Sequence, residues 1–147
     1  MNSDLLVQLQ ATKPLVVNYA NFVTPGFVAN GLNALGASPI MTLAAEEAEA
    51  LIASANALVI NLGTVNAQDM PLVRALAQAA TDAHKPIILD PVAVGATAVR
   101  QAAANELLEN FAITVIRGNA GEIAYLAGID AHAKASMPAI LPPPQQN

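Results

Sequence analysis

Short apolar runs alternate along the chain with stretches in which apolar residues recur at helical spacing. Five runs have the length and composition of buried strands, namely residues 15–17, 39–41, 57–62, 86–89 and 113–116. The helical stripes between them are Val28, Leu32 and Leu35, ended by Gly36; Ala48, Leu51, Ile52 and Ala55; Val73, Leu76, Ala77 and Ala80; and Ala104, Leu107, Leu108 and Phe111. This alternation predicts an α/β fold of three layers, in which βα repeats build a mostly parallel sheet with right-handed crossovers.

Polar and glycine residues mark where several of these helices begin and end. Asn66, with Asp69 three residues on, is predicted to cap the third helix, and Thr97 the fourth. Gly128 stands where a helix that begins near Asn119 would end.

The βα pattern stops near residue 130. Four of the chain's ten prolines fall in residues 131–147, where neither a strand nor a helix pattern is visible. We therefore expect one βα domain over residues 1–130 and a proline-rich, disordered tail over residues 131–147.

Composition and charge exclude several classes of function. Hydrophobic residues make up 54% and charged residues 12%, which favours a folded domain. The net charge of −5 and the lack of any Lys/Arg cluster argue against nucleic-acid binding, and the absence of cysteine excludes thiolate chemistry. The apolar runs are too short for a membrane span and the N-terminus does not resemble a signal peptide, so we expect no membrane association and a cytoplasmic protein.

Polar residues gather just after the predicted strands. In order along the chain they include Asn21, Asn61, Asp90 and Arg117, with Asn119 and Glu122 following Arg117 and Met41 following the second strand. The carboxyl ends of parallel strands share one edge of the sheet, where ligands bind in open α/β folds. We therefore expect these residues to lie near one another.

The residue types at this edge suit phosphoryl transfer. Arg117 offers a permanent cation for phosphate oxygens. Asp90 and Glu122 are hard oxygen donors, which suits Mg²⁺ held through water. A cation, two carboxylates and helix N-termini are what such chemistry uses, although spacing alone names no substrate.

Structural roles stay open for the same residues. Asp90 precedes a proline and could simply start a turn, and Glu122 could be a first-turn carboxylate favoured by the helix dipole. Met41 is a residue type that more often packs in a core than contacts a ligand. Three common nucleotide or hydrolase motifs, G-x-G-x-x-G, G-x-x-x-x-G-K-[ST] and G-x-S-x-G, do not occur in the sequence.

Several segments resemble hydroxyethylthiazole kinases, which belong to the ribokinase-like superfamily. They are N-F-V-T at 21–24, A-N at 29–30, L-G-A-S-P-I-M at 35–41, I-N-L-G-T at 60–64, L-D-P-V-A-V-G-A at 89–96 and I-R-G-N-A-G-E-I at 116–123. The last of these contains the N-x-x-E pattern of the superfamily. The motifs occur in the right order over residues 14–129, which makes the resemblance specific.

The resemblance implies a reaction and roles for matching residues. ATP, with Mg²⁺, would phosphorylate the hydroxyl of 4-methyl-5-(2-hydroxyethyl)thiazole in thiamine salvage. The roles implied are substrate binding by Met41 and Asn21, ATP binding by Arg117 and Asn119, and Mg²⁺ held through water by Asp90 and Glu122. Members of the family form homotrimers with substrate sites at subunit boundaries.

Two departures from the family are visible. The first strand has V-N-Y-A at 17–20 where the family commonly has a His-Cys-containing strand. Family members also continue for about as many residues again, through a glycine-rich turn that supplies the anion hole and the catalytic residue. We therefore expect a ribokinase-like sheet truncated after about five strands, with no catalytic residue in this chain. Three hypotheses follow: a kinase, a catalytically inactive fragment, or a small α/β binding module.

Overall fold

The computed structural model describes residues 3–129, in which the five predicted strands form one fully parallel sheet. The elements in chain order are α1 Ser3–Thr12, β1 Leu15–Tyr19, α2 Pro25–Leu35, β2 Ser38–Ile40, η1 Ala45–Glu47, α3 Ala48–Ser54, β3 Ala57–Asn61, α4 Met70–Asp82, β4 Ile87–Asp90, α5 Ala98–Asn110, β5 Ile113–Ile116 and α6 Ala120–Leu126. The predicted α/β class and βα alternation are confirmed. The predicted tail, residues 131–147, lies outside the described residues.

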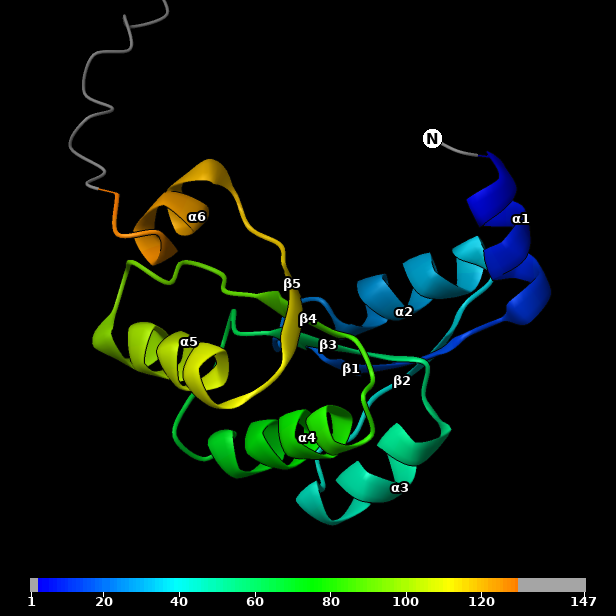
Figure 1. Ribbon diagram of the computed structural model, residues 1–147, viewed down its shortest axis with the longest axis horizontal. Helices are drawn as coiled ribbons and strands as arrows, with labels where there is room; N and C mark the ends of the chain where they lie inside the picture. The colour runs from blue at the N-terminus through cyan, green and yellow to red at the C-terminus, as the bar shows by residue number, and fades with distance from the viewer. Residues whose placement is uncertain (1–2, 130–147) are drawn as a thin grey trace, which may run out of the picture.

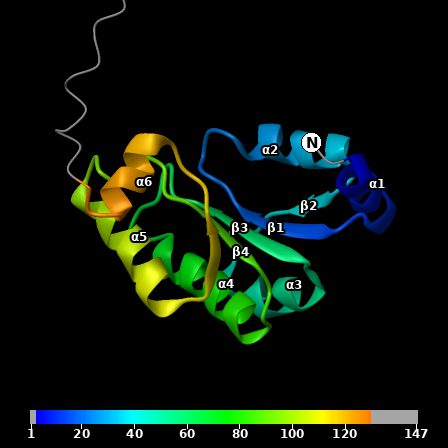
Figure 2. The ribbon, with the colours of Figure 1, turned by 45° about the horizontal axis from the view of Figure 1, so that its top comes forward.

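The strands lie in the order β2-β1-β3-β4-β5, which makes the fold doubly wound. The chain leaves β1 toward β2 at one edge and then crosses back to β3 on the other side of β1. Figures 1 and 2 show α3, α4 and α5 on one side of the sheet and α2 and α6 on the other. The predicted three layers are therefore present, and the crevice at a switch point opens between β1 and β3.

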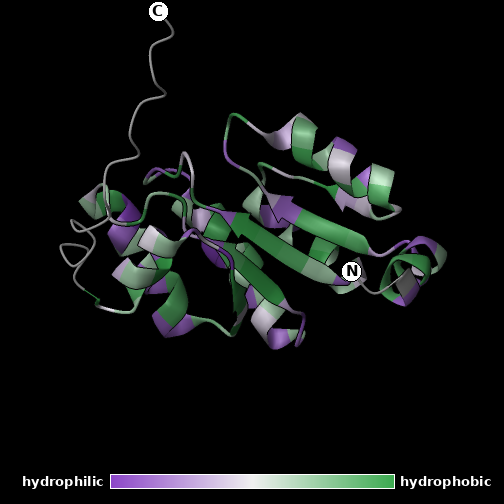
Figure 3. Cartoon of the chain, turned by 90° about the horizontal axis from the view of Figure 1, so that it is seen from above, coloured by the Kyte–Doolittle hydropathy of each residue, from purple (hydrophilic) through white to green (hydrophobic). Residues whose placement is uncertain are grey.

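The core lies between the sheet and the α3–α4–α5 layer. Leu58, Ile60, Ile87 and Leu89 of β3 and β4 are fully buried. They pack in one cluster with the helical residues Ile52, Val73, Leu76, Ala77, Ala80, Ala104 and Leu107. In Figure 3 the central strands are coloured as hydrophobic, while hydrophilic residues colour the outer parts of the helices. The predicted stripes on α3, α4 and α5 thus form the core.

The stripe on α2 behaves differently. None of its residues is buried, and Leu35 is exposed. Its end matches the prediction, because Gly36 adopts a positive φ of 99° and its N–H bonds to the last turn. The helix packs mainly on the edge strand β2, so little protein covers its outer side.

Helix ends were predicted with mixed success. Thr97 caps α5 by accepting a hydrogen bond from Arg100 N, as predicted, and Gly128 follows α6 with a φ of 67°. The prediction that Asn66 caps α4 is wrong, because the helix begins at Met70 with Asp69 as N-cap. Asn66 instead closes the preceding turn, with its side chain accepting from Gln68 N and Asp69 N.

One helix was not predicted at all. None of residues 4–12 of α1 is buried, because Leu5 and Val7 are exposed and Leu6 and Leu9 are half-buried, so the helix adds little to the core. Within residues 3–129, no helix is long and apolar enough to cross a membrane.

Candidate functional site

The carboxyl ends of the five strands carry one candidate residue each, in spatial order. Met41 follows β2, Asn21 lies two residues beyond β1, Asn61 ends β3, Asp90 ends β4 and Arg117 follows β5. Neighbouring strands lie about 4.8 Å apart, so the row spans about 19 Å from Met41 to Arg117. The expectation that these residues share one edge of the sheet is confirmed.

Hydrogen bonds join the middle of this row. Asn21 Nδ2 donates to Asn61 Oδ1 at 2.9 Å, and Asn61 Nδ2 donates to Asp90 Oδ2 at 2.9 Å. Strand register makes the second bond available, because Asn61 lies directly opposite Asp90. The first bond crosses the switch point between β1 and β3, where the backbone must come close. A Cβ on Gly63 would lie 2.9 Å from both Asn21 Cβ and Asn61 Oδ1, so only glycine fits there.

Arg117 completes the row by donating from Nη1 to Asp90 Oδ2 at 2.6 Å. The two partners differ in exposure, since the side chain of Asp90 is 10% exposed and that of Arg117 76%. Asp90 is therefore anchored by Asn61 and Arg117 from two sides. Arg117 leaves most of its guanidinium in solvent, where an anion can reach it.

The start of α6 is closed by its own side chains. Asn119 Oδ1 accepts from Gly121 N and Glu122 N, and Glu122 Oε2 accepts from Asn119 N at 2.8 Å, which makes a full capping box. Glu122 Oε1 accepts from Ala93 N at 2.8 Å. Ala93 has a φ of 53°, which is rare for alanine, so Glu122 holds a strained loop against α6.

These contacts narrow the predicted roles at α6. The three amides of Asn119, Gly121 and Glu122 already have protein acceptors, so they are not open donors for a phosphate. The structural role suggested for Glu122 is therefore real, and Asn119 shares it. Both residues nevertheless line the candidate cavity described next.

A cavity of about 370 Å³ lies at the β4–β5 end of the row. It is lined by Asp90, Val92, Arg117, Gly118, Asn119 and Glu122. The structure thus brings together the four residues predicted to bind ATP and Mg²⁺. Asn21 and Met41, predicted to bind the substrate, lie outside this cavity toward the β1–β2 end, so the row has two distinct parts.

The two carboxylates suit Mg²⁺ only through water. Both Glu122 oxygens and Asp90 Oδ2 already accept hydrogen bonds from protein groups, and direct ligation would compete with these bonds. The described residues contain no cluster of three or more His, Cys, Asp or Glu side chains able to hold a metal directly. Carboxylates facing one cavity fit a cation that keeps its water shell, as Mg²⁺ commonly does.

Arg100 belongs to this edge of the sheet and was missed in the sequence. From α5 it donates Nη1 to Val92 O at 2.9 Å and to Leu62 O at 3.2 Å, and Nη2 to Gly63 O. It therefore ties the loop after β3 to the loop after β4. Its acceptors are backbone carbonyls, which no sequence motif reports.

Three groups with shifted pKa values lie outside the row. Burial, and then the nearby charge of Asp69, raises the pKa of Tyr19 far above its ordinary value. Arg74 on α4 and Glu106 on α5 form an exposed ion pair, in which their hydrogen bond raises the pKa of the arginine and lowers that of the glutamate.

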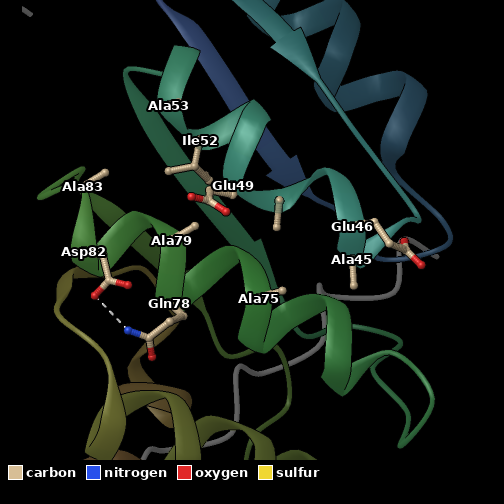
Figure 4. Close-up of a pocket in the computed structure, with 11 residues that line it drawn as sticks. Ala45, Glu46, Glu49, Ile52, Ala53, Ala75, Gln78, Ala79, Asp82 and Ala83 are labelled. Carbon is tan, nitrogen blue, oxygen red and sulfur yellow. Dashed lines mark hydrogen bonds between the residues drawn. The ribbon is translucent and has the colours of Figure 1, made fainter.

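A larger cavity of about 750 Å³ lies between the η1–α3 segment and α4, away from the strand ends (Figure 4). Small side chains, mostly alanine, form its walls, and its ionisable side chains are the carboxylates of Glu46, Glu49 and Asp82. Three negative charges without a cation would repel a phosphate. The smaller cavity, which has Arg117, is therefore the better candidate site.

Comparison with known proteins identifies the family of the chain. A family model described as the hydroxyethylthiazole kinase family matches residues 6–136. Curated hydroxyethylthiazole kinases of Pediococcus pentosaceus and Lactiplantibacillus plantarum are 55% and 52% identical over 130 and 134 residues, covering 88% and 91% of this chain. The solved structure of the hydroxyethylthiazole kinase protein from Pyrococcus horikoshii OT3 superposes with a TM-score of 0.82 at 42% identity, over 85% of this chain.

The alignments cover a smaller share of the relatives than of this chain. The alignments span 49% and 51% of the two bacterial proteins and 49% of the solved chain. The chain therefore spans about half the length of the curated relatives it matches.

Proposed function

Because the chain belongs to the hydroxyethylthiazole kinase family, we propose that it acts in transfer of a phosphoryl group from ATP to the hydroxyl of 4-methyl-5-(2-hydroxyethyl)thiazole, in thiamine salvage. The observation that carries this proposal is the row of strand-end residues. One part, around Met41 and Asn21, would bind the thiazole, and the other, the cavity with Arg117 and Asp90, would bind the ATP phosphates.

The residues of the phosphate part would act mainly through charge and position. Arg117 keeps one N–H on Asp90 and would offer the others to phosphate oxygens. Asp90 and Glu122 would hold the waters of Mg²⁺, which when bound neutralises charge on the phosphates. Asn119 would line the nucleotide end of the cavity while capping α6.

A second candidate is a binding module or inactive fragment of the same kinase. One observation favours it, because both carboxylates at this edge already accept several protein hydrogen bonds. Neither Asp90 nor Glu122 is thus set up to take a proton from the substrate alcohol, and we assign no catalytic base among residues 3–129.

We also propose that the protein assembles as the family's homotrimer. Phe22, Phe27 and Leu43 are 89%, 84% and 95% exposed; Phe22 and Leu43 lie in the loops after β1 and β2, and Phe27 lies in the first turn of α2. Apolar side chains gathered on a surface favour an interface there, which would place the thiazole part at a subunit boundary.

Sedimentation at three times the mass of 15.1 kDa would support this assembly, and a monomer would contradict it. A cytoplasmic location would give such an enzyme its ATP.

The proposal is tested by incubating the purified chain with Mg-ATP and hydroxyethylthiazole and measuring ADP and phosphorylated thiazole. We expect product only when both substrates are present. Arg117→Ala should lower the rate by about 10²-fold or more, since it removes the cation at the phosphates. Arg74→Ala is the matched control, because its exposed ion pair with Glu106 joins α4 to α5 away from the row.

The result distinguishes the two candidates. Binding of both ligands without ADP release supports the binding module or inactive fragment. Failure of the chain to bind either ligand overturns both readings of the site.

A further inference from the structure

The carboxamide of Asn21 has almost no freedom of orientation. Its Oδ1 accepts from Val23 N at 2.8 Å and Thr24 N at 3.2 Å, and its Nδ2 donates to Asn61 Oδ1. A backbone N–H can only donate, so the oxygen must face residues 23 and 24. The group that Asn21 still offers to a ligand is therefore the second N–H of Nδ2.

Asn61 is oriented in the same way by groups that allow one arrangement. Its Oδ1 accepts from Gly63 N at 2.9 Å and from Asn21, while its Nδ2 donates to Asp90 Oδ2. A backbone N–H on one side and a carboxylate on the other fix which atom is oxygen. Hydrogen bonds therefore run in one direction, from Asn21 to Asn61 to Asp90, and Arg117 donates to Asp90 from the far side.

We propose that Asn61 is a positioning residue for substrate binding. The backbone N–H groups of residues 23 and 24 make Asn21 Nδ2 the donor, and Asn61 takes one of its two N–H groups and so directs the other at the substrate. The site then selects a ligand with an acceptor atom. The inference rests on the proposed function, since it assumes that the thiazole binds near Asn21. Hydroxyethylthiazole carries two such acceptors, the ring nitrogen and the hydroxyl oxygen.

Asparagine is required at position 61 because its side chain bonds to both Asn21 and Asp90. The side chain must accept from Asn21 and donate to Asp90 within a space that Gly63 already limits. Aspartate has the same shape but no donor, and would place a second negative charge against Asp90. Alanine would leave Asn21 Nδ2 without its acceptor and its carboxamide less restrained.

The hydrogen-bond direction is tested first by exchanging the two residues. Asn61→Asp should lower the melting temperature by about 5–10 °C, because like charges meet in a partly buried place. Asp90→Asn alone should be milder, since its amide oxygen can accept both bonds. The double variant Asn61→Asp/Asp90→Asn should recover part of the loss, because it removes the like charges and the amide introduced at position 90 can donate to the carboxylate introduced at position 61. The recovery should be incomplete, because the nitrogen of that amide then faces Arg117 Nη1 in place of an oxygen. A double variant no more stable than Asn61→Asp overturns the proposal.

A ligand test then separates positioning from mere support of the fold. Dissociation constants are measured for hydroxyethylthiazole, for its thiophene analogue without the ring nitrogen, and for the 5-ethyl analogue without the hydroxyl. The wild-type chain should bind hydroxyethylthiazole about tenfold more tightly than the analogue that lacks the atom accepting from Asn21. Asn61→Ala should reduce this preference, because the N–H of Asn21 that faces the ligand loses the restraint from residue 61, and the exchanged double variant should keep it.

The side-chain amide resonance of Asn21, assigned with Asn21→Ala, gives a signature independent of ligand. One of its two protons should be shifted by the bond to residue 61 in the wild type and in the double variant, but not in Asn61→Ala. An unchanged preference or an unchanged resonance in Asn61→Ala overturns the positioning role. If no thiazole binds to the wild type, the proposed function fails, and the melting and resonance data still decide the hydrogen-bond direction.

Discussion

Arg100 should be the most sensitive arginine in the chain to replacement. Its guanidinium donates to the carbonyls of Leu62, Gly63 and Val92 in a partly buried position. Hydrogen bonds from a charged donor contribute about 1.5–3 kcal/mol each, and partial access of water to these carbonyls reduces the loss toward about 1 kcal/mol each. Arg100→Met keeps much of the aliphatic stem, so we expect a loss of about 3 kcal/mol in the free energy of unfolding.

Urea unfolding followed by far-ultraviolet circular dichroism measures this loss. The midpoint should fall while the slope with urea stays the same, and the melting temperature should fall by about 10 °C. Arg74→Met provides the matched control, since Arg74 makes a single exposed ion pair with Glu106 and should matter little. A loss below about 1 kcal/mol for Arg100→Met, or an equal loss in the control, would refute the claim that Arg100 ties the two loops together.

Three further predictions address single contacts. Gly63→Ala should destabilise the chain and weaken thiazole binding, because its Cβ would clash with Asn21. Gly31→Ala, in the open middle of α2, should instead raise the free energy of unfolding by about 0.5–1 kcal/mol. Equal urea midpoints for the two variants would contradict this difference. Asn119→Ala should cost about 1 kcal/mol in urea unfolding by removing the cap of α6, and no loss would show that the capping box is unimportant. Because the folded state raises the pKa of Tyr19 above the ordinary 10.0, its stabilisation is complete below that pH and is lost as the pH rises beyond it. Tyr19→Phe should therefore flatten the decline of the melting temperature above pH 10.0, and an unchanged decline would show that Tyr19 is not its source.

The strands and the edge of the sheet that holds the site were predictable from local pattern. Strands such as β3 and β4 are buried on one face and half-buried on the other, so their residues are nearly all apolar and stand out in the sequence. Polar residues at or just after the ends of β1, β3, β4 and β5 then mark the candidate ligand edge, because all the strands run in the same direction. Asp90 and Arg117 were found in this way.

Two local errors have physical causes. The sequence pattern does not predict α1, because Leu5 and Val7 are exposed and Leu6 and Leu9 only half-buried, and a helix without a buried face leaves a weak periodic signal. The sequence pattern predicts Asn66 as a helix cap, although Pro71 lies in the first turn of α4. Proline suits that turn and breaks a helix that starts several residues earlier, so Pro71 was the signal that could have placed the start correctly.

The roles of Asn61 and Arg100 could not be predicted because they depend on distant chain segments. Asn61 was visible at a strand end, but its bond to Asp90 follows from the register of β3 on β4. Arg100 donates to carbonyls 37 and 38 residues away in the chain, and backbone acceptors look alike in any sequence. The same limit applies to Glu122, whose bond to Ala93 depends on how two loops meet.

The most direct test of the two-part site is to map both ligands by amide chemical shifts on the ¹⁵N-labelled chain. We expect hydroxyethylthiazole to shift the signals of residues 18–24, 40–43 and 61–64. Mg-ADP should shift those of residues 90–95 and 117–122. Shifts that gather instead around the alanine-lined cavity between α3 and α4, or both ligands acting on the same end of the row, would contradict it.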